Sequence, residues 1–390
     1  RDLLARLTPE KDGVDGSKIY LYGEGWNFGE VANNARGANA TQPNMAGTGI
    51  GTFSDRLRDA VRGGGAFRGL HEQGFATGLF TTPNETYQGE SGFQRARLLL
   101  AMDQIRVGLA GNLRDYRLEN LHGHIVSGHE VPYHDQPTGY ALDPQEVITY
   151  VEAHDNETVW DALQIKAPAG ATLEQRVRMQ QVANSLVALA QGVPFFHAGQ
   201  DLLRSKSLDR NSYNSGDWFN RLDWTYATNN WGVGLPPGDN KHHWPIMKQL
   251  LRRPELKPGK AEIESTATHF REMLRIRRSS PLFRLRTAEQ IQQKVHFLNT
   301  GPGQIPGLIV MQLLDTDPRI DGKYEQIVVM FNATPITQTL AHPDLQHAGL
   351  ELHPVQAASG SVAGSAAIDG LGALSVPAYT TAVFVSLARS

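Results

Sequence analysis

The first 280 residues alternate between short apolar runs and longer stretches with helical spacing. An apolar and aromatic run from Ile19 to Tyr22 predicts a strand that is buried on both faces. Comparable runs predict three further strands, at 75–80, 147–153 and 193–197. Apolar residues at helical spacing predict helices at 53–61, 93–109, 177–189, 240–252 and 260–278. Strand and helix thus alternate four times, which is typical of a parallel α/β sheet.

The pattern changes at about residue 280. Alternating apolar runs separated by turn clusters follow, at 307–314, 326–331 and 378–385. Such runs are typical of an antiparallel β-sandwich, so we expect two domains, at 1–280 and 281–390. All six tryptophans lie between residues 26 and 244, so we expect the second domain to stabilise the first rather than to act as a binding module.

Informative polar residues come directly after the predicted strands. Glu24 follows the first strand between Gly23 and Gly25, which allow a sharp turn, and Trp26 and Phe28 come next. A carboxylate at the carboxyl end of a buried strand, beside aromatic side chains, is how a barrel presents an acid to a sugar. From this stretch alone, a glutamate that only satisfies a loop explains the pattern equally well.

A second carboxylate stands in the sequence His154-Asp155-Asn156, at the end of the third predicted strand. Glycoside hydrolysis needs two carboxyl groups that flank the glycosidic bond. Because Glu24 and Asp155 end strands that are not neighbours, they could face each other across the mouth of a barrel. A polar turn that ends a strand is the alternative interpretation of this triplet.

The strand-end positions favour a (β/α)8 TIM barrel, which keeps its active site at the carboxyl ends of its strands. Four predicted strands make half of such a barrel, and half a barrel leaves two open edges. We therefore expect the second half of a TIM barrel followed by the antiparallel β-sandwich. The upstream half of the same polypeptide is the expected partner that closes the barrel.

Composition narrows the classes of function. Of the 390 residues, 40% are hydrophobic and 20% are charged, as in soluble globular proteins, and the net charge is −3. Without an extended basic stripe, nucleic acid and anionic membrane are poor partners. There are no cysteines, which excludes disulfides and thiolate chemistry. The chain opens at Arg1 without a signal peptide, so we expect the natural protein to begin far upstream. The compartment stays open, with a secreted or periplasmic protein slightly favoured.

Four segments occur in order and together resemble the second half of pullulanase and plant-type limit dextrinase, debranching members of the α-amylase superfamily. These segments are Tyr20–Trp26, Phe53–Ala60, Val151–Thr158 and Ser212–Asn220. The resemblance covers about residues 1–285, and the tail is similar to the C-terminal β domain of that family, less specifically.

The resemblance implies hydrolysis of α-1,6 branch linkages in pullulan, amylopectin and limit dextrins, with retention of configuration. It assigns Glu24 as the general acid/base at the end of the fifth barrel strand. It assigns Asp155 as the carboxylate that binds and distorts the sugar at the cleaved bond. His154 is expected to form a hydrogen bond with the same sugar ring. Glu24 must hold a proton near neutral pH, and we expect burial or a nearby negative charge to favour this.

Further substrate contacts are implied by the same resemblance. Asp217 and Arg221 match a pair that grips the next sugar toward the non-reducing end. Trp26 and Phe28 are expected to stack on sugars on the leaving-group side, and Asn156 is interpreted as a substrate-binding residue.

One departure from the family concerns the nucleophile, which is an aspartate at the end of the fourth strand. Only Asp2, Asp12 and Asp15 precede Glu24, and none of them ends an apolar strand. We therefore expect the nucleophile to lie upstream of this chain, and the isolated chain to be inactive.

No cofactor and no metal is assigned from the sequence. A calcium ion of the family would need carboxylates that the sequence does not place, and the histidines at 122, 124, 129 and 134 lie in a polar insertion without metal-site spacing. Two rival functions remain. One is an α-1,4-acting amylase or transglycosylase of the same superfamily, disfavoured because Ala153 precedes and Asn156 follows the His-Asp pair. The other is a noncatalytic carbohydrate-binding protein that lost the nucleophile.

Overall fold

The computed structural model describes residues 1–66 and 69–388. A parallel sheet of four short strands lies in the N-terminal half, in the order β1-β2-β7-β8. Its strands are β1 (Tyr22–Gly23), β2 (Gly51–Phe53), β7 (Val147–Thr149) and β8 (Val193–Pro194). β7 and β8 fall within predicted runs, and β1 overlaps a third run at Tyr22. The parallel arrangement and the number of strands agree with the sequence, although these three strands are shorter than predicted.

The strand predicted at 75–80 is wrong, and β2 was missed. Phe75–Thr77 form a single turn of 3-10 helix, which ends at Gly78 in the left-handed region. The missing strand, Gly51–Phe53, comes immediately before a helix, so the helical spacing that begins at Phe53 hides it. Glycine at 51 has a packing reason, because a Cβ there would lie 2.0 Å from the Tyr20 hydroxyl.

The first predicted strand is not buried. Ile19, Tyr20 and Leu21 are exposed and lie outside β1, and Tyr22 is 54% exposed. β1 is an edge strand of the sheet, with β2 as its neighbour on one side. An apolar run predicts a buried strand only where other strands lie on both sides of it. Within the described residues, β1 has a neighbouring strand, β2, on one side.

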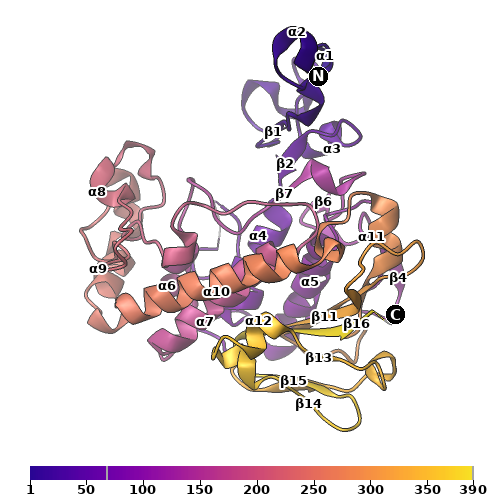
Figure 1. The fold of residues 1–390 in the computed structure, drawn as a ribbon. Helices are drawn as coiled ribbons and strands as arrows, with labels where there is room; N and C mark the ends of the chain where they lie inside the picture. Colours follow the sequence, from indigo (N-terminus) through magenta and orange to yellow (C-terminus); the bar gives the residue numbers. More distant parts are fainter. Residues whose placement is uncertain (67–68, 389–390) are drawn as a thin grey trace.

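Long helices pack beside the parallel sheet (Figure 1). The helices of eight or more residues are α4 (Asp55–Arg62), α5 (Ser91–Leu109), α6 (Val159–Lys166), α7 (Leu173–Leu189), α9 (Trp244–Leu251) and α10 (Lys260–Ser279). The shorter ones are α1 (Asp2–Ala5), α2 (Pro9–Asp12), α3 (Gln42–Met45), α8 (Asp217–Asn220), α11 (Ala288–Lys294) and α12 (Pro354–Ala357). None of the helices in the described residues is both long and apolar enough to cross a membrane.

The ends of the long helices follow local sequence rules. Thr172 and Gln175 form a capping box at the start of α7, with the Thr172 side chain accepting from the Gln175 amide at 3.2 Å. α4 ends at Gly63, whose φ is +90° and where a Cβ would lie 2.3 Å from the backbone of Gln73. Only glycine fits this close approach at a positive φ.

Two hairpins occupy the polar insertion before β7. One pairs β3 (Arg117–Glu119) with β4 (Ile125–Ser127), and the other pairs β5 (Pro132–Tyr133) with β6 (Gln136–Pro137). The second hairpin brings Tyr133 toward the parallel sheet, where it takes part in the site described below.

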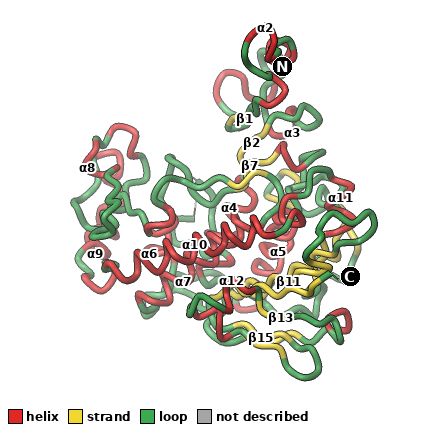
Figure 2. Tube along the Cα trace, in the orientation of Figure 1, coloured by secondary structure: helices red, strands yellow, loops and turns green. Residues whose placement is uncertain are grey.

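The C-terminal part contains two antiparallel sheets, as the sequence predicted. Their orders are β13-β16-β11-β10-β9 and β12-β15-β14. The strands are β9 (Val295–Phe297), β10 (Leu308–Leu314), β11 (Tyr324–Asn332), β12 (Gln338–Leu340), β13 (Glu351–Leu352), β14 (Ala367–Ile368), β15 (Leu374–Val376) and β16 (Thr380–Leu387). Figure 2 shows them in yellow below the helical layer.

Both faces of the larger antiparallel sheet are buried. Val329 and Phe331 of β11 belong to the core that also contains the helices α5 and α7. Val328 and Met330, which alternate with them, pack with Leu374 of the smaller sheet. One hydrophobic core therefore contains residues from both sides of residue 280. The domain boundary expected at this residue stays a prediction.

Candidate functional site

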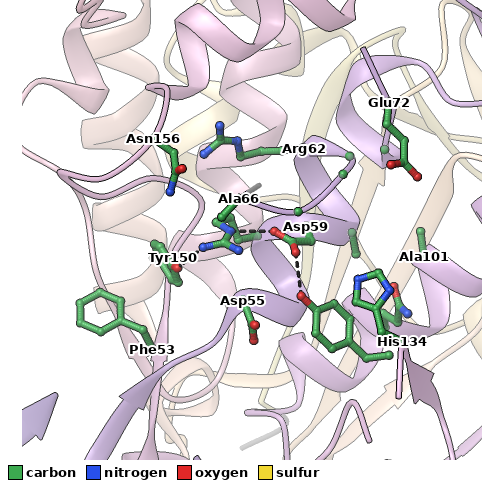
Figure 3. Close-up of a pocket in the computed structure, with 18 of the residues that line it drawn as sticks. Phe53, Asp55, Asp59, Arg62, Ala66, Glu72, Ala101, His134, Tyr150 and Asn156 are labelled. Carbon is green, nitrogen blue, oxygen red and sulfur yellow. Dashed lines mark hydrogen bonds and ion pairs between the residues drawn. The ribbon is translucent and has the colours of Figure 1, made fainter. Parts of the chain in front are cut away.

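A cavity of about 960 Å³ lies at the carboxyl ends of β1, β2 and β7. The segments that follow these three strands supply much of its lining (Figure 3). Among the lining residues are six that the sequence singled out, namely Glu24, Trp26, Phe28, His154, Asp155 and Asn156. Residues far apart in the sequence therefore converge on one cavity, as expected for the carboxyl edge of a parallel sheet.

Glu24, His154 and Asp155 form the polar centre of this cavity. One carboxylate oxygen or ring nitrogen from each of the three lies within 4.8 Å of the others. His154 Nε2 lies 3.5 Å from Asp155 Oδ1. All three side chains are exposed. The burial expected around Glu24 is therefore absent, whereas the expected negative charge beside it is present as Asp155.

The turn after Glu24 is set by close contact with β2. Gly25 has φ +75°, and a Cβ at this position would lie 2.8 Å from the Thr52 side chain. The Gly25 carbonyl accepts a hydrogen bond of 3.1 Å from the Gln42 amide. The backbone that carries Glu24 is thus held against β2 from two directions, and glycine is required for it.

A row of aromatic rings crosses the sheet at the same edge. The Phe53 ring lies 5.0 Å from the rings of both Tyr150 and Phe195, and 6.1 Å from that of Tyr22. Phe53 ends β2, Tyr150 and Phe195 directly follow β7 and β8, and Tyr22 is the first residue of β1. The sequence did not single them out as site residues, although the strand-end rule that led to Glu24 also applies to Phe53, Tyr150 and Phe195. Phe53 and Tyr150 line the cavity and give it an aromatic wall suited to the faces of sugar rings.

A polar network lines the cavity below this row. Asp59 accepts hydrogen bonds of 2.7 Å from Arg58 Nε and from the Tyr133 hydroxyl (dashed in Figure 3). Arg58 Nη1 donates to the Tyr150 hydroxyl at 2.7 Å. Burial raises the pKa of Tyr150 to about 12, so its hydroxyl stays protonated at neutral pH. Sequence reasoning missed this network because its members come from a helix, a hairpin and a strand end.

Asp217 and Arg221 lie elsewhere. They line a separate cavity of about 370 Å³ together with Trp218 and Asn220, around α8. In Figure 1, α8 lies at the left edge of the molecule, whereas β1 lies in its upper part. The structure therefore does not bring this pair into one cavity with Glu24 and Asp155.

Within the described residues, Glu24, His154 and Asp155 are also the one group of three potential metal ligands. All three are exposed, and three protein ligands fall short of the six to eight oxygens that calcium prefers. The loop histidines form no such group in the described part of the chain.

Comparison with known proteins relates the chain to one family. The family model described as "Alpha-1,6-glucosidases, pullulanase-type, C-terminal" matches residues 226–387. The chain is 51% identical to chloroplastic pullulanase 1 of Arabidopsis thaliana, over 99% of this chain and 41% of that protein. It is 39% identical to a pullulanase of Klebsiella pneumoniae, over 94% of this chain and 34% of that protein. The chain thus spans less than half the length of these two relatives.

Solved structures give the same relation. The crystal structure of apo pullulanase from Klebsiella pneumoniae has a TM-score of 0.90 and 39% identity, and it covers 95% of this chain and 40% of its own. The same enzyme complexed with maltotriose has a TM-score of 0.89 and 39% identity, with 95% of this chain and 35% of its own covered.

Proposed function

The chain is homologous to the C-terminal portion of pullulanases, and from this premise we propose that its complete polypeptide hydrolyses α-1,6 branch linkages in α-glucans. Pullulan, amylopectin and limit dextrins are the proposed substrates. The observation that carries the proposal is the convergence of Glu24, His154 and Asp155 at one edge of a parallel sheet, inside a large cavity with an aromatic wall. This is the arrangement that glycoside hydrolysis needs, with carboxyl groups and sugar-stacking rings together.

The proposed fold of the complete enzyme is a (β/α)8 barrel whose second half is the sheet β1-β2-β7-β8. Two features support this. The strands are all parallel, and the candidate residues lie at their carboxyl ends. The exposed edge of β1, with its aromatic and aliphatic residues 19–22, would pair with the preceding barrel strand of the same polypeptide.

In the proposed mechanism, the nucleophile attacks the sugar carbon while Glu24 protonates the leaving oxygen, which gives a covalent glycosyl-enzyme. Glu24 then activates the water that hydrolyses this intermediate, and the two successive inversions retain the configuration. Asp155 and His154 would bind hydroxyl groups of the sugar at the cleaved bond and stabilise its distorted form. The nucleophile would be an aspartate outside these 390 residues. Asp2 lies in α1, Asp12 lies in α2 and Asp15 caps a 3-10 turn, so none of these three ends a strand. The isolated chain is accordingly proposed to be inactive.

Aromatic side chains of the cavity are proposed to bind the substrate by stacking, and polar side chains are proposed to add hydrogen bonds. Phe28 is 68% exposed and Trp26 is half-buried, and both line the cavity, where their rings would stack on glucose units. Asn156 would donate or accept a hydrogen bond beside them. Asp217 and Arg221, in their separate cavity, would hold a more distant glucose of the same chain.

The test is Glu24→Gln in the complete polypeptide with pullulan as substrate. Loss of the acid should lower kcat by at least about 100-fold, because general acid–base catalysis contributes a factor of this size or more. Oligosaccharide affinity should change little, since glutamine keeps the shape of the side chain. Glu30→Gln is the control, because Glu30 is exposed, pairs with Arg36 at 3.1 Å and does not line the cavity.

The products separate the rival functions. Release of maltotriose from pullulan supports cleavage of α-1,6 bonds, whereas trisaccharides that keep an α-1,6 bond support the α-1,4-acting amylase. Binding without any hydrolysis by the complete polypeptide would favour the noncatalytic carbohydrate-binding protein. Unchanged turnover of Glu24→Gln would refute the role of Glu24.

A further inference from the structure

The backbone that carries His154 and Asp155 is held by side chains. Within the described residues, no backbone–backbone hydrogen bond involves residues 152–157. Asn156 lies in the left-handed region, with φ +62°. The His154 and Asp155 side chains are 73% and 62% exposed, so packing does not fix their direction. The direction of both side chains therefore depends on what holds the backbone of this turn.

Lys206 makes one of these contacts. Its Nζ donates a hydrogen bond of 2.9 Å to the carbonyl oxygen of His154, the residue directly before Asp155. In the described part of the chain this is the one hydrogen bond that Lys206 Nζ makes, and the residue is completely buried. The backbone amide of Lys206 is itself fixed, because it donates to the buried carboxylate of Asp161 at 2.8 Å.

Two further contacts hold the flanks of the turn. Arg62 Nη1 donates to the carbonyl oxygen of Val151 at 3.2 Å. Glu157 is gripped by Arg62 Nη2 at 3.3 Å and by Arg210 Nε at 2.6 Å. The turn is thus held at residues 151, 154 and 157, and Lys206 supplies the hold nearest to Asp155.

A buried ammonium group is unfavourable for the stability of the fold, so stability alone does not explain Lys206. Burial of a charge costs free energy unless it is paired. Among the described residues, Lys206 has no ion pair within 4.0 Å, and the carboxylates of Asp161, Asp209 and Glu152 act on its charge only from a greater distance. A well-packed apolar side chain of similar length would serve stability at least as well. A charged donor is better than an apolar group in one respect, because it fixes the direction of a carbonyl.

We propose that Lys206 is a positioning residue, which aims Asp155 toward Glu24 by holding the carbonyl group of His154. The proposal rests on the debranching function proposed above and adds a specific residue to it. Without the donor, the peptide between residues 154 and 155 is free to rotate, and the exposed Asp155 carboxylate leaves its place near Glu24. Stacking on the aromatic wall does not depend on Lys206.

The test uses Lys206→Met in the complete polypeptide. Methionine has a similar length and no charge, so the variant is expected to fold. We expect kcat on pullulan to fall by about 10- to 100-fold, because a displacement of about 1 Å can cost about 100-fold. KM should stay within about threefold, since the lost interaction acts in the transition state. Lys206→Arg keeps a charged donor and should recover part of kcat.

Lys294→Met is the control for loss of a buried ammonium group. Lys294 is also fully buried and donates to the backbone carbonyls of Thr316 and Pro318, in the C-terminal sheet region. Unlike Lys206, it also pairs with a carboxylate, that of Asp315 at 3.5 Å. This variant should lose stability without losing kcat. If both variants lose activity only in proportion to their loss of stability, the proposal is overturned.

A double variant distinguishes positioning of Asp155 from an independent effect. If Lys206 acts through Asp155, then Lys206→Met combined with Asp155→Asn should have the kcat of Asp155→Asn alone. Independent, multiplicative losses would overturn the proposal.

A crystal structure of Lys206→Met gives a readout that does not depend on activity. We expect the backbone at 154–155 to move by about 1 Å or more. An unmoved backbone overturns the role of Lys206 even if the wild type is active. A wild type without activity on pullulan refutes the debranching function instead, and the position of this backbone then decides on Lys206.

Discussion

Removing the carboxylate of Glu157 should destabilise the fold strongly. Glu157 is buried between two guanidinium groups, with Arg62 Nη2 at 3.3 Å and Arg210 Nε at 2.6 Å, and its side chain is 7% exposed. Glu157→Gln keeps the shape of the side chain but leaves the buried Arg62 and the half-buried Arg210 without their shared anion. Breaking a buried ion pair in this way costs about 3–5 kcal/mol. We expect a loss of this size in the free energy of unfolding.

The pH dependence follows from the direction of the pKa shift. Although burial opposes ionisation, the charges of Arg62 and Arg210 lower the pKa of Glu157 below its ordinary value of 4.5. A carboxyl group whose pKa is lower in the folded state stabilises the fold above the unfolded pKa. This stabilisation is lost as the pH falls through the folded pKa. The difference between wild type and Glu157→Gln should therefore be constant from pH 6 to 8 and shrink below about pH 4.5.

Urea unfolding followed by tryptophan fluorescence measures this difference, since all six tryptophans lie between residues 26 and 244. Glu255→Gln is the control, because Glu255 pairs with Arg253 at 2.7 Å on the surface and is 58% exposed. Its unfolding midpoint should not change measurably. A Glu157→Gln protein as stable as the wild type at pH 7, or a difference that grows on acidification, would refute the reasoning.

Two further substitutions test the core and the turn after Glu24. Phe331→Ala should lower the free energy of unfolding by about 3–5 kcal/mol, because Phe331 is fully buried against the helical layer, whereas Ile336→Ala, at a position 61% exposed, should have little effect in the same urea titration. Gly25→Ala should lower kcat on pullulan about tenfold or more, because its Cβ would lie 2.8 Å from Thr52 and would shift Glu24. Gly29→Ala has a similar φ of +70° and open space around its Cβ, so it should keep kcat, and equal kcat values for these two glycine variants would contradict the argument.

Some residues of the site can be recognised from the local sequence, and others cannot. Glu24, His154 and Asp155 were found because each follows an apolar run, and a strand end is a local feature. Asp59 and Tyr133 were not found, because they come from a helix and a hairpin that meet only in the folded chain. No spacing in the sequence connects them.

Helices and their ends were decided largely by the sequence. α5, α7 and α10 lie where apolar residues recur at helical spacing, and the capping box of Thr172 and Gln175 marks the start of α7. Both are local effects, since side chains three and four residues apart meet on one helix face whatever surrounds the helix. The strands of the C-terminal sheets were predicted from another local feature, because their apolar runs are bounded by clusters of turn residues.

The parallel strands and the meeting of Glu24 with Asp155 were decided by tertiary structure. A strand of two or three residues, such as β1 or β2, is too short for any periodicity, and only pairing with its neighbours defines it. The exposure of Tyr22 follows from which neighbours β1 has, and the separate cavity of Asp217 follows from where α8 packs. The sequence determined which residues end strands, and the packing of the sheet determined which of those ends lie side by side.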